Sequence, residues 1–520
     1  MTELGHGSNV QAVETTAHYD HETSSFIMNS PTETSIKFWI GNLGKTCSMI
    51  VIFAQLILDN ENHGVHVFLV PVRQRETHDI YEGITIGDCG DKIGLQGIDN
   101  GWIKFTNYRI GKEMLLNKFA DVNDEGLYVS SIPKAGKRFA YHMAALSGGR
   151  LLAAVNAADI SLVCSITAIR YSACRKQFAR KRDQEEATIL DYPLHQARLL
   201  PDFARGYLES IAMQYVWNEY TDLAPKLSDP SDKAGEYFHL LSSALKAITT
   251  WNCSDTWRES RLACGGMGYS YLNNFAELGA ISDVNQTWEG ENYVLIQQAC
   301  KLLLKNFTNL MRGKETMKTC EFMTSDTPEE YKFEGSFSSL NDIGKLFSYQ
   351  ANKCVHEAIF KIQTETMKEK EMRLSKGEIW EKHLYYTFIP MVKAYLQRYI
   401  LITYIKFLEK FNDSPKSKEV LGKLALLHFS TEIIKNEGMF RDTISKEQIE
   451  DLKERCIGLS QELRPEIVAL TFTVPFKDNT YGSIGKSNMQ PYAEFMKGVV
   501  NTPDCFGKPK KWSYLYQSKI

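Results

Sequence analysis

The chain has 520 residues, 43% of them hydrophobic, and a formal net charge of −3 at pH 7. This length allows roughly two to four domains with a sizeable core, and the near-neutral charge gives no general reason to expect nucleic acid or an anionic membrane as partner. The eleven cysteines include no C-x-x-C pair, which argues against a disulfide framework or a metal ribbon and favours a reducing compartment.

Residues 1–115 have the pattern of β structure. Short apolar or alternating runs lie between turn residues, as is typical of strands. The sequence Asp99-Asn100-Gly101 stands before an alternating run and predicts a hairpin turn, because Asn-Gly tolerates the positive φ of a type I′ turn. The runs are 26–28, 36–40, 49–58 and 65–72.

From about residue 137 the hydrophobic period becomes helical. A long apolar pattern covers 139–178 and ends in basic residues, and we predict it to be helical throughout. Asn156, Asp159 and Ser161 interrupt its apolar part, so we expect no membrane span, which needs about 20 largely apolar residues. Further helices are predicted over 201–227, 236–264 and 292–311.

Residues 312–339 are polar and contain Gly313, Pro328 and Gly335, which is typical of a linker. A second helical block follows from about residue 340. The sequence therefore predicts an α+β protein with a β domain over 1–115, a helical domain over 136–311, the linker 312–339, and a C-terminal helical domain over 340–500.

Two apparent motifs can be rejected as functional sites. "GNLGKT" at 41–46 resembles a phosphate-binding P-loop, but that loop requires a glycine where this chain has Trp39. His63 and His66 have H-x-x-H spacing in a strand-like region with no third ligand nearby, so we expect no metal site.

Four separated segments remain. They are "TELGHGSN" at 2–9, "KFWIGNLGKT" at 37–46, "SGGRLLAAVNAADISLVCSITAIRYSACRKQF" at 147–178, and "ACGGMGY" followed by "TWEGENYVLIQQA" within 263–299. Singly, each has an ordinary structural interpretation: Gly265-Gly266 as a helix end, Arg175 as a solvated helix face, Glu289 as a partner for a helix dipole. In this order and at this spacing they resemble the acyl-CoA oxidases of the acyl-CoA dehydrogenase superfamily, and the resemblance extends to "FKDNTYGSIG" at 476–485.

The resemblance implies a β-barrel-like domain followed by two helical-bundle domains, with FAD as cofactor. It places Thr2 against the flavin's pyrimidine edge and Trp39 against the ring. Gly41 matches a position where the dehydrogenases carry Thr and the oxidases carry Gly, which should open a path for oxygen. The segment with Arg175, Gln177 and Phe178 is expected to reach the FAD phosphates, usually across a dimer interface, and Gly265 and Gly266 to let backbone approach the cofactor.

The resemblance also implies the catalytic base. Glu289 matches the carboxylate that removes a proton α to the thioester, after which a hydride leaves the β-carbon for the flavin. Trp288 is expected to desolvate this base and raise its pKa. Ser8 and Arg150 are expected to contact the substrate.

The family carries a helical domain ahead of "TELGHG", which we expect this chain to lack. We therefore expect the Thr2 cradle to be a loosely held terminus, with weak FAD binding and slow turnover.

The function that the resemblance implies is FAD-dependent oxidation of fatty acyl-CoA by O₂ to trans-2-enoyl-CoA and H₂O₂, by a homodimer. Ser518-Lys519-Ile520 resembles the peroxisomal address Ser-Lys-Leu, so we expect a peroxisomal location. The alternative is a non-catalytic subunit that dimerises with an intact oxidase and modulates it. A dehydrogenase that uses an electron-transfer partner is disfavoured by Gly41 and by the extra C-terminal helical domain.

Overall fold

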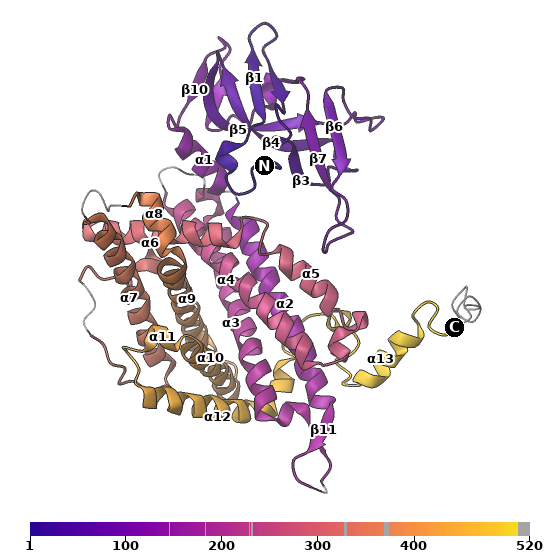
Figure 1. Cartoon of the computed structure of the whole chain (residues 1–520), viewed down its shortest axis with the longest axis vertical. Coiled ribbons are helices and arrows are strands. Elements are labelled where there is room, and N and C mark those ends of the chain that lie inside the picture. The colour runs from indigo at the N-terminus through magenta and orange to yellow at the C-terminus, as the bar shows by residue number, and fades with distance from the viewer. Residues whose placement is uncertain are drawn as a thin grey trace, which may run out of the picture. The chain divides into compact units, whose positions relative to one another are not determined.

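The computed structural model describes residues 1–507 apart from 145, 183, 228, 230–231, 327–329 and 369–373. The chain forms two compact units. The first comprises Met1–Ser147 and Leu223–Phe238, and the second Gly148–Asp222 and His239–Ile520. Most strands belong to the first unit and most helices to the second, which agrees with the predicted α+β class (Figure 1).

The first unit is built from antiparallel sheets with one parallel pair. A five-stranded sheet has the order β5-β4-β1-β2-β8, in which β1 pairs with β4 in parallel, and a three-stranded sheet has the order β3-β7-β6. Among the described residues the sheets stay separate and close no barrel. The strands are β1 (Thr16–Asp20), β2 (Ser25–Asn29), β3 (Lys37–Gly41), β4 (Met49–Leu58), β5 (Glu61–Pro71), β6 (Ile84–Asp88), β7 (Asn100–Phe105), β8 (Tyr108–Gly111), β9 (Ala120–Val122) and β10 (Tyr128–Ser130), followed by helix α1 (Ala135–Ala144).

The core of this unit is formed by strands in which buried and more exposed side chains alternate. In β4 every second side chain is buried, because successive side chains point to opposite faces of a sheet. Phe26, Ile52, Phe68 and Phe105 are fully buried in one cluster, and Phe26 and Phe68 meet edge to face with ring centroids 5.1 Å apart.

The predicted hairpin turn at Asn100-Gly101 is wrong. Both residues lie in β7 and pair with β3, Asn100 opposite Gly41 and Gly101 opposite Ile40. Gly101 is required for close approach instead of for positive φ, since a Cβ atom there would lie 2.4 Å from the backbone nitrogen of Gly44. The turn signal and the close-approach signal use the same residue type.

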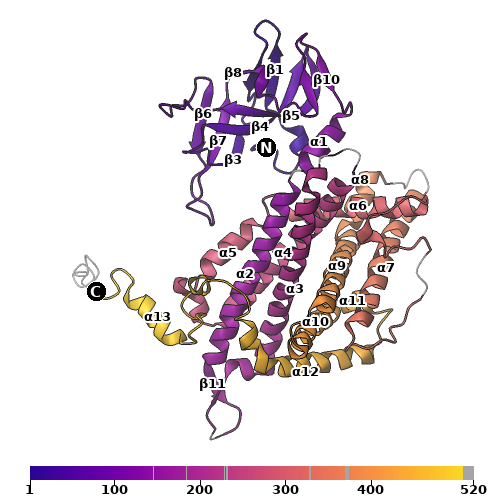
Figure 2. The same cartoon turned by 180° about the vertical axis from the view of Figure 1, so that it is seen from behind.

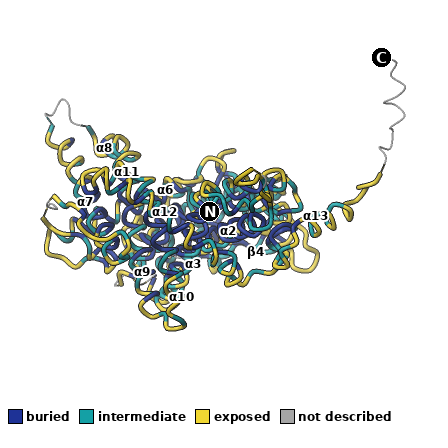
Figure 3. Tube along the Cα trace, turned by 90° about the horizontal axis from the view of Figure 1, so that it is seen from below, coloured by how far each residue is buried: buried dark blue, intermediate teal, exposed yellow. Residues whose placement is uncertain are grey.

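The second unit begins as a helical bundle in which α2, α3 and α4 run side by side in both views (Figures 1 and 2). Helices α2 and α3 are buried along much of their length (Figure 3), and many of their buried side chains are apolar. The elements of this part are α2 (Ser147–Cys174), β11 (Lys176–Ala179), β12 (Glu186–Thr188), α3 (Pro193–Leu223), α4 (Ala234–Ala263), α5 (Phe275–Val284) and α6 (Asn292–Met311). Helix α3 starts eight residues before the predicted start at Pro201, with Pro193 at its first position, which suits a residue that has no N–H to donate.

The long pattern over 139–178 is not one helix. It is divided into α1 and α2, and α2 ends at Cys174, so Arg175 follows the helix and Gln177 and Phe178 lie in β11. Phe178 has a φ of 57°, which no α-helix accommodates. By length and composition the described stretch Ala135–Cys174 could cross a membrane, but 78% of its most apolar window is buried inside the protein, as in a core helix.

The C-terminal helices continue the second unit. Segment 312–339 has little regular structure, yet Met317 and Phe333 are buried, and Gln448 donates a 2.8 Å hydrogen bond to the Phe333 carbonyl. It is therefore packed against the helices that follow. These are α7 (Leu340–Thr366), α8 (Lys376–His383), a π-helical turn (Leu384–Phe388), α9 (Ile389–Lys410), α10 (Pro415–Lys435), α11 (Glu437–Phe440), α12 (Lys446–Leu470) and α13 (Pro491–Val500).

Candidate active site

The Thr2 cradle lies beside β3 in the first unit. Thr2 Oγ1 donates a 2.9 Å hydrogen bond to the Phe38 carbonyl, and the Phe38 N–H donates to the Thr2 carbonyl at 3.2 Å. The bonds to Phe38 extend the sheet edge to the start of the chain and fix where the Thr2 hydroxyl stands.

The expectation that this cradle is loosely held is not supported. Glu3 is buried, and its carboxylate accepts from the backbone N–H of Thr15 at 2.9 Å and from Lys37 Nζ, also at 2.9 Å. Lys37 is fully buried as well, and burial lowers its pKa to about 8 although Glu3 opposes the shift. A buried ion pair with further hydrogen bonds fixes local geometry, because either charge alone would be costly to leave unpaired.

Trp39 and Gly41 lie on β3 close to this cradle. Trp39 has a φ of 68°, an unfavourable conformation for a bulky residue, and its indole is 57% exposed. Gly41 is exposed, and a Cβ atom there would meet nothing within 4 Å. Ser8 is also exposed. The cradle thus presents an aromatic face beside an open backbone position.

Glu289 lies in the second unit, on a tight turn between α5 and α6. Its φ is 56°, and Gly290 follows with a φ of 106°, so two successive residues adopt left-handed conformations. The Glu289 carbonyl accepts from Arg150 Nε at 3.0 Å, and the Gly290 carbonyl accepts from Lys246 Nζ at 2.7 Å. Two basic side chains from two different helices, Arg150 of α2 and Lys246 of α4, therefore hold the backbone of this turn.

The Glu289 carboxylate lies directly over Gly149, the third residue of α2. A Cβ atom at position 149 would come within 2.6 Å of Oε2 and 2.9 Å of Oε1, so only glycine leaves room for it. Burial raises the pKa of Glu289, while the positive charges of Arg150 and Lys246 oppose the rise. Although Glu289 is exposed at the surface, the protein around its carboxylate raises its pKa, and a carboxylate with a raised pKa is a stronger proton acceptor than a fully solvated one.

The residues beside Glu289 have other partners. Trp288 is 44% exposed and its indole N–H donates to Asn285 at 2.8 Å, so its expected part in desolvating the base stays a prediction. Glu291 caps α6 by accepting from the Val294 N–H. Arg150 Nη1 lies 2.8 Å from His239 Nδ1, and burial lowers the pKa of His239 to about 4, so this imidazole is neutral and accepts.

Gly149, Lys246 and His239 are not among the residues predicted from the sequence. The signals were present: "SGGR" places a glycine directly before Arg150, and Lys246 interrupts the apolar run "SALKAI". A lysine at a core position of a helix needs a polar partner, which the pattern alone cannot identify.

A second group of predicted residues gathers after α2. Arg175 Nη2 donates to Gln177 Oε1 at 3.0 Å, and Arg175 Nη1 donates to the Tyr492 hydroxyl of α13 at 3.4 Å. Phe178 is 71% exposed. Gly265 has a φ of 57°, and neither it nor Gly266 would bring a Cβ atom within 4 Å of another group.

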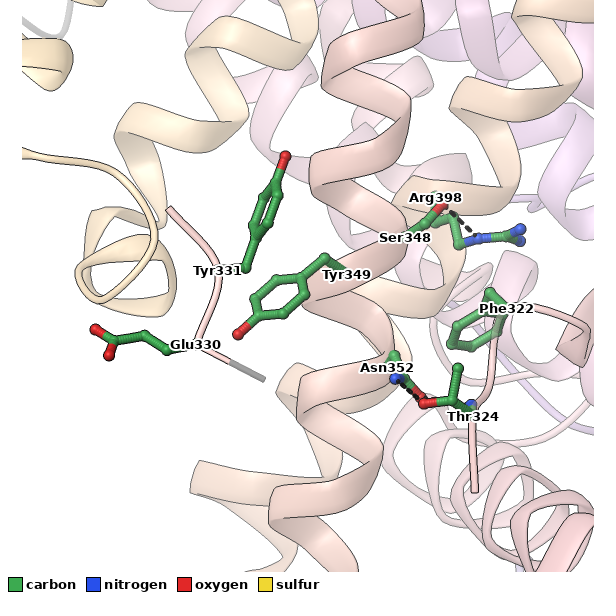
Figure 4. A pocket seen from close by; sticks show the side chains of 8 residues that line it. All are labelled: Phe322, Thr324, Glu330, Tyr331, Ser348, Tyr349, Asn352 and Arg398. Atoms are coloured by element: carbon green, nitrogen blue, oxygen red, sulfur yellow. Dashed lines mark hydrogen bonds between the residues drawn. The ribbon is translucent and has the colours of Figure 1, made fainter. Parts of the chain in front are cut away.

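A surface pocket of about 480 Å³ lies elsewhere in the second unit, between α7, α9 and the preceding segment (Figure 4). Its polar groups bond to one another, as in the 2.8 Å bond from Asn352 to Thr324 and the 3.0 Å bond from Arg398 Nε to Ser348. It contains none of the predicted site residues. Its lining is Phe322, Thr324, Glu330, Tyr331, Ser348, Tyr349, Asn352 and Arg398.

Comparison with known proteins identifies the family. Residues 1–108 match the acyl-CoA dehydrogenase middle domain, 144–304 the acyl-CoA oxidase C-alpha1 domain, and 339–519 the acyl-CoA oxidase domain. Peroxisomal acyl-coenzyme A oxidase 1 of Mus musculus is 32% identical over 520 residues, covering 97% of this chain and 76% of that protein. The chain belongs to the acyl-CoA oxidase family.

The chain is also similar to other acyl-CoA oxidases in sequence and in structure. Peroxisomal acyl-coenzyme A oxidase 3 of Arabidopsis thaliana is 34% identical, over 91% of this chain and 69% of that protein. The crystal structure of acyl-CoA oxidase 3 from Yarrowia lipolytica superposes with a TM-score of 0.89 at 29% identity, covering 100% of this chain and 76% of that one. Acyl-CoA oxidase 1 of Caenorhabditis elegans, complexed with FAD and ATP, gives 0.88 at 26% identity, over 99% and 76%. The acyl-CoA oxidase fold is thereby confirmed.

Proposed function

We propose that this acyl-CoA oxidase family member uses FAD to oxidise fatty acyl-CoA with O₂, forming trans-2-enoyl-CoA and H₂O₂. The observation that supports this most is the Glu289 carboxylate, which lies over Gly149 and has a raised pKa. Proton abstraction next to a thioester needs such a carboxylate.

The residues expected to hold FAD fit a flavin nucleotide. Trp39 presents an exposed indole, and Gly41, Gly265 and Gly266 have open space where a side chain would stand. A planar ring needs an aromatic or apolar face, and phosphates need backbone N–H groups and a guanidinium such as that of Arg175. When bound, FAD would accept the hydride from the β-carbon and pass electrons to O₂.

In the reaction, the residues of this chain remove the α-proton of the substrate. Glu289 takes the α-proton on its carboxylate, and its burial makes the neutral, protonated product favourable. Arg150 holds the Glu289 carbonyl and so fixes the direction from which the carboxylate approaches. Its expected contact with the substrate stays a prediction.

Gly41 should control the reaction of reduced flavin with oxygen. Gly41→Thr is expected to slow reoxidation by O₂ and to leave reduction by acyl-CoA less affected. Since a Cβ atom meets nothing within 4 Å and Thr suits a strand, the sheet should tolerate the change. Stopped-flow measurement of both half-reactions tests this, and an unchanged oxidative half-reaction would exclude Gly41 as the oxygen gate.

We further propose a homodimer in which the Arg175 segment reaches FAD bound mainly by the other subunit. Exposed aromatic side chains occur in this segment and in the 267–273 turns, of which the second packs against α13: Phe178 is 71% exposed, Tyr269 86% and Tyr271 71%. Helix α13 adds Tyr492 and Met496, both more than two-fifths exposed. Apolar side chains gathered on a surface in this way favour a protein interface.

Arg175→Ala is expected to weaken FAD retention without unfolding the chain, because Arg175 is only partly buried and its side-chain bonds go to two other side chains, Gln177 and Tyr492. FAD content after gel filtration and the thermal midpoint measure the two effects. An Arg175→Ala protein that keeps FAD as tightly as the parent would remove the phosphate assignment.

The relatives' names support a peroxisomal location, which we propose for this chain. Ser518-Lys519-Ile520, the predicted address, lies outside the described residues.

A visible absorption spectrum and a peroxide assay test the proposed function together. A yellow protein that releases H₂O₂ on addition of acyl-CoA supports it. A folded, colourless protein would support the non-catalytic alternative. A yellow protein that acyl-CoA reduces but O₂ does not reoxidise would instead indicate a dehydrogenase.

A further inference from the structure

Lys246 is an unusual residue for its place in the fold. It lies in the middle of α4 with no exposed surface, between the fully buried Leu245 and Ala247. Burying an ammonium group is costly unless it is paired and hydrogen-bonded. Its Nζ donates to the Gly290 carbonyl at 2.7 Å and to Asn292 Oδ1 at 2.9 Å, so both partners belong to the turn that carries Glu289.

Asn292 fastens the same turn to α4 a second time. It is buried, and its Nδ2 donates to the Ala247 carbonyl at 3.1 Å and to Thr250 Oγ1 at 2.8 Å. Helix α4 therefore holds the turn at two points, the Gly290 carbonyl and the Asn292 side chain.

The turn needs such a restraint. A non-glycine residue with a φ of 56°, as at Glu289, is strained and persists only where the surroundings impose it. Because the direction of the Glu289 side chain depends on this backbone conformation, whatever fixes the Gly290 carbonyl also fixes the carboxylate over Gly149.

We propose that Lys246 is a positioning residue of the active site, which holds the 289–292 turn so that the Glu289 carboxylate stays over Gly149. This rests on the proposed function, in which Glu289 is the base. Lys246 touches neither the reacting atoms nor the proton, and acts through the Gly290 carbonyl and through its charge.

The positive charge of Lys246 lowers the pKa of Glu289. The charged groups acting on Lys246 are Glu289 and Glu291 from the turn and Arg150 from α2, and Arg150 in turn contacts the neutral His239 of α4. Burial lowers the pKa of Lys246 to about 7, so Lys246 is a cation below that pH, where it favours the ionised form of Glu289 against the effect of burial on that carboxylate. Without that cation the pKa of Glu289 rises further, and the carboxylate stays protonated up to a higher pH.

The test uses the full chain loaded with FAD, and two variants. Lys246→Met removes the charge and both hydrogen bonds, whereas Lys246→Gln removes the charge and keeps an N–H donor. Anaerobic reduction of the flavin by acyl-CoA is followed by stopped flow across the pH range, together with reoxidation by O₂ and FAD content. Lys353→Met is the matched control, because Lys353 pairs with Asp442 at 3.0 Å in the C-terminal helices and has no part in the turn.

Lys246→Met should slow flavin reduction by about 10²-fold, the loss typical of a catalytic group displaced by about 1 Å. Lys246→Gln should lose less in rate. In both variants the acid limb of the pH profile should move to higher pH, while reoxidation and FAD content stay as in the parent and in Lys353→Met. A purely structural role would lower FAD content and all rates together and leave the pH profile in place.

Unchanged reduction rates and an unchanged acid limb in both variants would overturn the proposal. If acyl-CoA fails to reduce even the parent, the proposed function fails instead, and a crystal structure of Lys246→Gln decides the positioning role by itself. A Glu289 carboxylate displaced from Gly149 supports the role, and a carboxylate in its original place refutes it.

Discussion

Glu289→Gln is expected to lower the rate of flavin reduction by acyl-CoA by about 10²–10⁴-fold, the contribution typical of a general base. Gln keeps the size and hydrogen-bonding shape of the side chain, so the turn held by Arg150 and Lys246 should survive. FAD content and the thermal midpoint should therefore stay close to those of the parent. Single-turnover stopped flow under anaerobic conditions isolates the proton-transfer step from the reaction with oxygen.

Glu291→Gln is the natural comparison, two residues away. Glu291 caps α6 through its side-chain oxygen, and the amide oxygen of Gln can accept the same hydrogen bond from Val294. Its flavin reduction should resemble that of the parent. A large loss of rate in Glu291→Gln, with little change in Glu289→Gln, would show that the base is Glu291 and not Glu289.

Gly149→Ala should have the second-largest effect, although it adds only one methyl group. The new Cβ atom would lie 2.6 Å from Oε2 and 2.7 Å from Cδ of Glu289, so the carboxylate must move. A displacement of about 1 Å can cost about 10²-fold in rate. Because α2 has ordinary helical geometry at Gly149, Ala should not destabilise the helix, and Gly-to-Ala changes in helices often stabilise by roughly 0.5–1 kcal/mol.

Gly422→Ala in α10 controls for the helix effect, since a Cβ atom there meets nothing within 4 Å. We expect parental rates in Gly422→Ala and slow reduction with a normal thermal midpoint in Gly149→Ala. If Gly149→Ala reduces its flavin at the parental rate, the carboxylate does not act from the position over Gly149.

Much of the architecture is predictable from local patterns. Helix α6 occupies 292–311, as its apolar period indicates, and α4 deviates from prediction by only one or two residues at each end. Such helices have a clear apolar stripe and few competing turn residues.

The wrong predictions occur where a residue or a short segment fits two local structures. Gly101 suits a turn but is used for close backbone approach. Residues 175–178 continue a basic helical pattern, but α2 ends at Cys174 and Gln177 and Phe178 lie in β11. In both places contacts distant in sequence override a local preference.

For the site, Glu289 was found only through the family resemblance, because a single carboxylate near a helix start is usually structural. The turn geometry, the space over Gly149 and the two basic side chains that hold the backbone depend on residues up to 140 positions apart in sequence. The 3.0 Å bond from Arg150 to the Glu289 carbonyl is such a contact, and no spacing rule predicts it.

The most direct test of the central claim is the anaerobic absorption spectrum of the purified chain before and after addition of a fatty acyl-CoA. We expect acyl-CoA to bleach the flavin spectrum of the parent and air to restore it with release of H₂O₂. In Glu289→Gln, acyl-CoA should leave the spectrum nearly unchanged over the same time. A flavin-loaded parent that acyl-CoA does not bleach, or a Glu289→Gln protein that bleaches as fast as the parent, would contradict the claim.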